Sequence, residues 1–252
     1  HSFPTRRSSD YVSQQDLGGA KVHTSKSGVA QFVSADDKAA LDDVRYLLSF
    51  LPSNNMEEPP TLDSEDPHDR LCPELVDILP ASSNQAYDMR KVITTVMDDG
   101  EFFEYASAWA PSIVCGFARL GGRPVGVVGN QPIALAGVLD IESSSKAAKF
   151  VRTCDAFNIP LVTFVDVPGF LPGVDQEHGG IIRHGAKLLY AYCEATVPRI
   201  QVITRKAYGG AYVVMDSKSI GSDLAFAWPS AELAVMGASG AVESVNSREL
   251  AA

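Results

Sequence analysis

The sequence predicts an α/β protein, and two patterns support that prediction. Apolar runs at 159–165 and 200–204 have the length of strands that are buried on both faces. Each run follows a segment with helical spacing of apolar residues, at 143–157 and from about 181 to 196. Strands that alternate with helices are typical of a parallel sheet with connecting helices, so we expect that architecture.

The pattern of residues 1–55 indicates less regular structure. Residues 1–10 are polar and aperiodic, and we interpret them as a non-native or disordered leader. In the segment 11–55, Ser34 is a plausible N-cap for an amphipathic helix that ends near Pro52. Its apolar residues at helical spacing are Ala40, Leu41, Val44, Leu47, Leu48 and Leu51.

Residues 56–80 are rich in proline and acidic residues, which indicates an extended connector between domains. After the connector, 88–96 predicts a short helix. The stretch 112–129 predicts two strands that turn at Gly121 and Gly122.

Composition excludes several classes of function. The chain has 252 residues and a formal charge of -10, whereas nucleic acids and anionic membranes attract clustered Lys and Arg. Metal-ligand spacing and long apolar spans are both lacking, so we expect no metal site and no membrane segment. Four cysteines, which we interpret as reduced, buried thiols, favour a cytoplasmic protein: Cys72, Cys115, Cys154 and Cys193.

The segment 204–215, TRKAYGGAYVVM, indicates a buried strand that runs into Gly209 and Gly210. Paired glycines permit backbone geometry that side chains forbid. If a helix starts near Ala211, its first amide N–H groups lack partners within the helix and can bind a developing oxyanion. A tight strand-to-helix turn that binds no ligand has the same pattern, so these residues alone leave both interpretations open.

Longer motifs around this turn carry a resemblance. Residues 166–186, DVPGFLPGVDQEHGGIIRHGA, form one motif, and residues 205–211, RKAYGGA, form the second. On these motifs the sequence resembles the carboxyltransferase β family of propionyl- and acetyl-CoA carboxylases, over nearly everything from Tyr11 to Val242. Shorter matches lie at 51–55, 87–90, 226–229 and 234–237.

The resemblance implies a crotonase-like fold with two related domains per subunit, assembled as a homohexamer. It implies transfer of a carboxyl group from biotin to the α-carbon of an acyl-CoA thioester such as propionyl-CoA or acetyl-CoA. The biotin is carried on a biotin carboxylase or biotin carboxyl carrier subunit. By the family's motif, the amides of Gly210 and Ala211 bind the ureido oxygen of biotin. The substrate and biotin site would also include Gly169, Phe170, Leu171, Pro172, Gly209, Tyr212 and Val213.

The family's second Gly-Gly pair, on the acyl-CoA side, has no counterpart in this sequence. The Gly18-Gly19-Ala20 turn matches a different element late in the family's N-domain, so we expect it to be structural. The chain stops soon after Ala241, where the family continues. We therefore expect a chain cut at both ends, with the biotin-side half-site present. Its parts are a leader (1–10), the end of the N-terminal carboxyltransferase domain (11–55), a linker (56–80) and a truncated C-terminal domain (81–252).

Two other features bear on specificity and catalysis. Family members that prefer propionyl-CoA commonly carry Asp at the position of Val213. An aliphatic residue there favours another or a broader acyl preference, with neutral drift as the alternative. Because biotin itself is the base in the family's mechanism, we interpret His178 and His184 as packing or hydrogen-bonding groups.

Three functions other than a carboxylase are compatible with parts of the sequence. A biotin-dependent decarboxylase or transcarboxylase would use the same half-site, and the sequence separates it poorly from a carboxylase. A non-catalytic assembly fragment of the same fold is the second. The Asp166-Val-Pro-Gly169 motif suggests a GTPase switch, but no phosphate-binding loop of the Gly-x-x-x-x-Gly-Lys type accompanies it.

Overall fold

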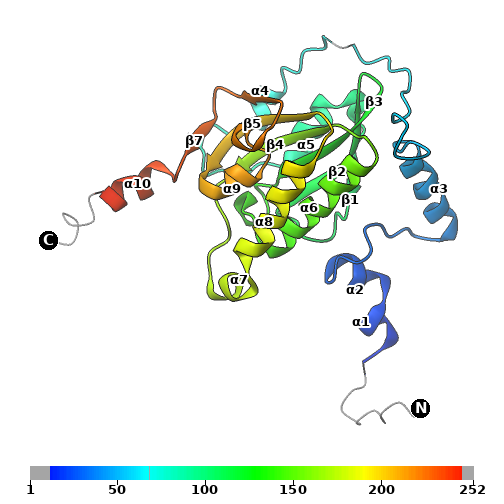
Figure 1. Ribbon diagram of the computed structural model, residues 1–252, viewed down its shortest axis with the longest axis horizontal. Helices are drawn as coiled ribbons and strands as arrows, with labels where there is room; N and C mark the ends of the chain where they lie inside the picture. Colours follow the sequence, from blue (N-terminus) through cyan, green and yellow to red (C-terminus); the bar gives the residue numbers. More distant parts are fainter. Residues whose placement is uncertain (1–11, 68, 246–252) are drawn as a thin grey trace.

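The computed structural model describes residues 12–67 and 69–245, so the leader expected at 1–10 lies outside the described residues. Within the described part, strands and helices alternate as the sequence predicts, and the α/β prediction is confirmed (Figure 1). None of the described helices is long and apolar enough to cross a membrane.

The described strands form one mixed, seven-stranded sheet in the order β1-β2-β3-β4-β5-β6, with β7 paired to the end of β5. The pairs β1–β2 and β2–β3 are antiparallel, whereas β3, β4, β5 and β6 run parallel. The strands are β1 Phe103–Tyr105, β2 Ile113–Leu120, β3 Arg123–Asn130, β4 Leu161–Val167, β5 Arg199–Tyr208, β6 Leu224–Ala227 and β7 Glu232–Ala234.

Helices connect the parallel strands. Helix α6 precedes β4, α7 and α8 precede β5, and α9 follows β5 directly. Both helices expected before the apolar runs are confirmed within two residues. The described helices are α1 Gln14–Gly18, α2 Ala20–Ser25, α3 Asp37–Leu48, α4 Leu75–Ile78, α5 Met89–Val96, α6 Ile141–Ala156, α7 Val174–Gly179, α8 Ile181–Glu194, α9 Gly209–Val214 and α10 Ala238–Val245.

The sheet has a hydrophobic cluster on each face. Alternate side chains of β2 point to opposite faces, as the strand period requires. Cys115 and Phe117 join the cluster that includes Phe150 of α6, and residues of α8 and α9 belong to the same cluster. Val114 and Ala118 join the cluster that includes α5. Helix α9 is therefore held against the core on the same face as α6 and α8.

The connector crosses the domain surface in contact with it. The Leu62 N–H donates to the carbonyl of Gly122 at 3.0 Å, and the side-chain amide of Asn158 donates to the carbonyls of Asn55 and Glu57 at 2.9 Å each. Within the expected connector 56–80, residues 58–65 have no regular secondary structure or turn, and the short helix α4 lies near its end. The domain boundary placed here stays a prediction.

Two details differ from expectation. The N-cap of α3 is Asp36, whose Oδ1 accepts from the Ala39 N–H at 2.8 Å, whereas Ser34 donates to Asp43. A cap must lie next to the first helical turn, and α3 begins at Asp37. Of the four cysteines expected to be buried, Cys115 and Cys154 are, whereas Cys72 is half-buried and Cys193 on α8 is exposed. All four cysteines are free.

Candidate functional site

The candidate site lies where β5 ends and α9 begins (Figure 1). Tyr208 closes the strand, and Gly209 reverses the chain with a φ of 57°, in the left-handed region that favours glycine. A Cβ atom at this position would also lie 3.0 Å from the carbonyl oxygen of Val235. Both constraints explain why the turn needs glycine at 209.

Two backbone amides are unpaired at this turn. Neither the Gly210 nor the Ala211 N–H donates a hydrogen bond within the part of the chain that the structure describes. Gly210 is exposed, whereas the methyl group of Ala211 is buried in the core and fixes the start of α9. Unpaired amides at the start of a helix can bind an anionic or carbonyl oxygen.

The loop after β4 lies against this turn through Phe170. A Cβ atom at Gly185 of α8 would lie 2.8 Å from the Phe170 ring, and one at Gly210 would lie 3.9 Å from it. The ring therefore sits between α8 and the turn. Leu139 holds the loop in place, because its N–H donates to Gly169 O and its carbonyl accepts from the Leu171 N–H.

A buried ion pair joins the ends of the two strands that lead to the loop and the turn. Asp166 Oδ2 accepts from Arg205 Nε at 3.0 Å, and both side chains are almost fully buried. Asp166 Oδ1 accepts from the Lys206 N–H, while Arg205 donates to the carbonyl of Gln85 at 2.7 Å. The guanidinium also lies 5.0 Å from the ring centre of Tyr87. These bonds join the ends of β4 and β5, a few residues before the glycines in the sequence.

Tyr208 is held by the neighbouring strand. Its hydroxyl donates to Glu232 Oε2 at the start of β7, and the backbones of Tyr208 and Ala234 pair. Burial, together with the hydrogen bond to Glu232, raises the pKa of Tyr208 to about 12. The tyrosine therefore stays neutral at physiological pH and acts as a donor that fixes the end of β5.

The structure brings together some of the predicted site residues. Phe170, Gly209, Gly210 and Ala211 meet at the turn, and Tyr212 and Val213 follow on α9, both partly buried. Gly169 and Leu171 flank Phe170 and are partly buried, whereas Pro172 is exposed.

His184 makes local contacts of the expected kind. Its Nδ1 lies 3.1 Å from Ser145 Oγ and 3.2 Å from Lys187 Nζ. Partial burial, with the positive charges of Lys187 and Arg183, lowers the pKa of His184.

Sequence reasoning missed the Asp166–Arg205 pair and the Tyr208–Glu232 bond. The available signal was charged residues inside buried apolar runs, since a buried charge needs a partner. Within the described residues, no group of three or more His, Cys, Asp or Glu side chains could hold a metal ion.

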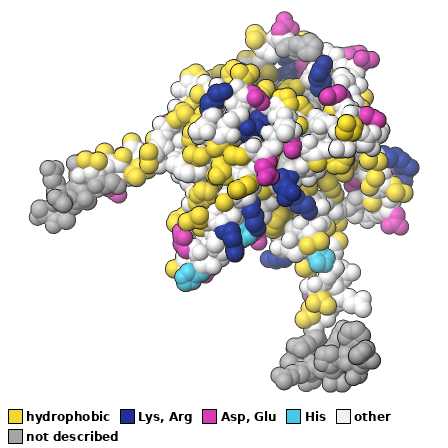
Figure 2. Space-filling model, in the orientation of Figure 1, with side chains coloured by type: hydrophobic (Ala, Val, Ile, Leu, Met, Phe, Trp, Pro, Cys, Tyr) yellow, Lys and Arg dark blue, Asp and Glu magenta, His cyan; other side chains and the backbone are white. Residues whose placement is uncertain are grey.

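A basic groove lies beside the site. The acidic chain needs a local positive surface if it binds anionic substrates, and Figure 2 shows Lys and Arg side chains gathered over α6 and α8. The groove between these helices has a volume of about 860 Å³ and an apolar floor that includes Ala148 and Ala186. Glu194 is its acidic member, and its cations are Lys149, Arg152, Arg183 and Lys187.

Comparisons with known proteins place the chain in a family. The carboxyl transferase domain matches residues 8–252. Methylmalonyl-CoA decarboxylase subunit alpha of Propionigenium modestum is 58% identical over 239 residues, covering 95% of this chain and 46% of that protein. The mitochondrial propionyl-CoA carboxylase beta chain of Mus musculus is 59% identical over 234 residues, covering 93% of this chain and 43% of that protein.

A solved structure agrees in fold. Transcarboxylase 12S, described as a hexamer with hydrolysed methylmalonyl-coenzyme A bound, superposes with a TM-score of 0.93 at 51% identity. The match covers 97% of this chain and 47% of that one. The chain thus spans about half the length of the relatives it matches. The crotonase-like carboxyltransferase fold expected from the motifs is confirmed, and the chain belongs to the carboxyl transferase domain family.

Proposed function

We propose that this chain is the biotin-side half of a carboxyltransferase that moves a carboxyl group between biotin and the α-carbon of an acyl-CoA. The observation that carries the proposal is the pair of unpaired amides at Gly210 and Ala211, at the position of the family's motif. Carboxybiotin, carried on a partner protein, supplies the carboxyl group. The two amides donate to its ureido oxygen and stabilise the negative charge that develops there.

The magnitude of this effect is substantial. A preorganised amide donor at an oxyanion contributes about 3 kcal/mol, or roughly a factor of 10²–10³ in rate. Gly169, Phe170, Leu171 and Pro172 form the neighbouring wall for biotin, with Tyr212 and Val213 toward the acyl group. Phe170 excludes water from one side of the turn, which strengthens hydrogen bonds to the bound oxygen.

The acyl-CoA half of the site comes from outside these residues. Gly18-Gly19-Ala20 does not supply it, since the Gly19 N–H donates to the carbonyl of Gln15 at 2.8 Å and serves to end α1. We propose that a second subunit of a hexamer contributes the acyl side, and that a biotin carboxylase or biotin carboxyl carrier subunit delivers biotin. The basic groove between α6 and α8 favours the approach of anionic substrates.

A second candidate function is decarboxylation or transcarboxylation on the same half-site. Relatives that the comparisons describe as a decarboxylase, a carboxylase and a transcarboxylase are 58%, 59% and 51% identical to this chain. These values do not separate the directions of transfer. A non-catalytic assembly role for the isolated piece is the third possibility, and the cytoplasmic location stays a prediction.

A matched pair of substitutions at Gly210 tests the proposal. Gly210→Pro removes one amide donor, whereas Gly210→Ala keeps the donor and adds a methyl group with ordinary contact to Phe170. We expect the proline variant to lose about 10²–10³-fold in carboxyl transfer and the alanine variant to stay within a few-fold. The assay uses the protein from the complete reading frame with its biotin carrier, and melting curves check folding. Equal rates in the two variants would refute the proposal.

The chain by itself gives a second test. Because the acyl-side Gly-Gly pair is missing, we expect no acyl-CoA carboxylation by the isolated polypeptide, even with biotin carrier added. Turnover at rates of an intact enzyme would contradict this. Sequencing the source DNA across both ends then tells whether an upstream domain with its own Gly-Gly loop belongs to the same reading frame.

A further inference from the structure

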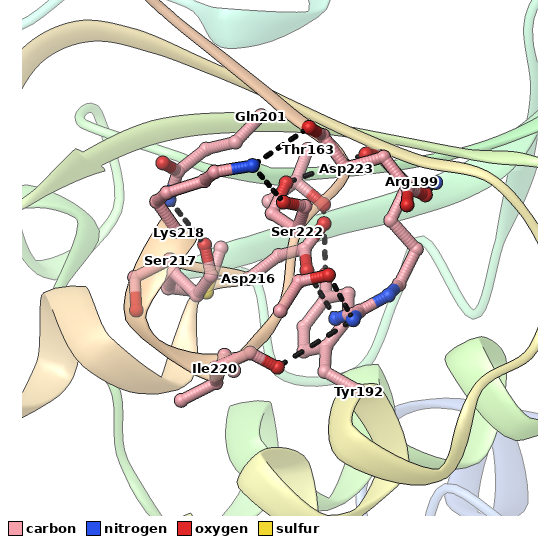
Figure 3. A network of polar contacts seen from close by, with 12 residues as sticks. Thr163, Tyr192, Arg199, Gln201, Asp216, Ser217, Lys218, Ile220, Ser222 and Asp223 are labelled. Carbon is pink, nitrogen blue, oxygen red and sulfur yellow. Dashed lines mark hydrogen bonds and ion pairs between the residues drawn. The ribbon is translucent and has the colours of Figure 1, made fainter.

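A buried network of charged and polar side chains lies at the far end of α9 (Figure 3). Asp216, two residues after the helix, is fully buried, and its Oδ1 accepts from Nη1 of Arg199 at 2.6 Å. Arg199 is the first residue of β5. Asp216 has a φ of 57°, which residues with a side chain rarely adopt, so surrounding contacts must hold it there.

Further bonds join β5 to the chain that leaves α9. The side-chain amide of Gln201 donates to the carbonyl of Met215 at 2.8 Å. Arg199 donates through Nη2 to the carbonyl of Gly221 at 2.7 Å and through its N–H to Asp223 Oδ2 at 2.8 Å. Residues 199 and 201 lie on the same face of the strand, so two side chains on one face of β5 bind residues 215, 216 and 221.

Helix α9 is therefore held at both ends. Its start is fixed by the glycine turn at 209 and its end by the bonds to Arg199 and Gln201. A six-residue helix is only about 9 Å long, so releasing its end changes the direction of the amides at its start. The buried side chains of Ala211 and Val214 pack it against the sheet but are small.

Opposing effects act on the pKa of Asp216. Burial raises its pKa to about 7, although the nearby Arg199 acts to lower it and Asp223 adds to the rise. Tyr192 also faces this carboxyl group, and its phenol stays neutral because burial raises its pKa. Asp216 Oδ2 and Gln201 Oε1 are buried without a hydrogen-bond partner. The bond to Arg199 is therefore the main polar contact of the Asp216 carboxyl group among the described residues.

We propose that Arg199 and Asp216 are positioning residues, whose ion pair holds α9 so that the Gly210 and Ala211 amides face the bound oxygen. The inference rests on the function proposed above for these amides. Neither residue contacts the site itself, because both lie at the opposite end of α9.

The raised pKa of Asp216 sets how the stability of the chain depends on pH. The folded-state pKa of Asp216 is raised above its unfolded value, so its contribution to stability is full below about pH 4 and is lost as pH rises through 7. Release of α9 would return the pKa of Asp216 toward its unfolded value, so a low pH favours the held arrangement of the helix. We therefore test the positioning role at a single pH, where kcat should fall while KM and the folded fraction stay unchanged.

The experiment compares Asp216→Asn with a control, Asp223→Asn, whose amide oxygen can still accept from the Arg199 N–H. In the protein from the complete reading frame with its biotin carrier, we expect Asp216→Asn to lower kcat about 10-fold at pH 8. The KM for acyl-CoA should stay within twofold, and Asp223→Asn should keep the wild-type kcat. A wild-type kcat in Asp216→Asn would overturn the inference.

Hydrogen exchange gives a readout that does not depend on activity. At pH 8, we expect the Met215 and Ser217 amides, which donate to the carbonyls of Tyr212 and Val213, to exchange at least several-fold faster in Asp216→Asn than in the wild type. Equal protection of these amides in the two proteins would overturn the inference. Arg199→Lys, which replaces the two-pronged guanidinium by a single amine, takes the place of Asp216→Asn if that variant does not fold. If Gly210→Pro loses carboxyl transfer and Asp216→Asn does not, only the positioning role fails. If Gly210→Pro keeps full activity, the proposed function fails.

Discussion

The two ends of α9 solve different physical problems. At its start, Gly210 and Ala211 present backbone amides at an open turn, and Gly210 is exposed. At its end, Arg199, Asp216 and Gln201 form a closed, buried network. A site made of backbone amides has no side chains of its own that can reorient. The direction of its amides therefore depends on the contacts that fix the helix, here those at its far end.

The strongest test of this division is the buried ion pair of Asp166 and Arg205. Arg205→Met leaves Asp166 as a buried carboxylate without its partner, which costs about 3–5 kcal/mol of unfolding free energy. Urea unfolding of the chain measures the loss. The double variant Arg205→Met with Asp166→Leu removes both charges and should recover most of it. Failure to recover would mean that Arg205 acts mainly through its bonds to the backbone of residues 82–85.

The glycine turn gives the next largest effect. Gly209→Ala places a side chain at a φ of 57° and a Cβ 3.0 Å from the Val235 carbonyl, which costs about 1–2 kcal/mol from the backbone alone. Gly210→Ala is the matched control, since alanine is favoured over glycine in a helix by about 0.5–1 kcal/mol. Thermal unfolding should therefore separate two adjacent Gly-to-Ala changes in opposite directions. A similar loss in both would show that the turn tolerates no side chain at either position.

Local patterns predicted one end of α9 and not the other. The turn at Gly209 and Gly210 is contiguous in the sequence, so paired glycines after an apolar run suffice to predict it. The helices and strands on either side were predicted for the same reason, because their periodicity lies within a single window. The N-cap of α3 was placed two residues early, since Ser34 and Asp36 are both good caps and only the geometry chooses.

The network at the far end could not be predicted, because its members come from separate elements. Asp216 pairs with a residue 17 positions away, and Asp166 with one 39 positions away. Likewise, Phe170 reaches Gly185 and Gly210 only after β4, α8 and β5 have packed. Charged residues in buried strands signal that partners exist, but the choice of partner depends on strand order and register.

The smallest expected effect concerns the groove between α6 and α8. Lys187→Glu reverses one of its four cations, which weakens the attraction of an anionic substrate. We expect kcat/KM for acyl-CoA to fall about 3-fold at low salt and the difference to vanish near 0.5 M salt, where charges are screened within a few Å. Lys91→Glu on α5 is the control, since it makes the same change in net charge on the opposite face of the sheet. An equal fall in both variants would mean that net charge matters and the groove does not.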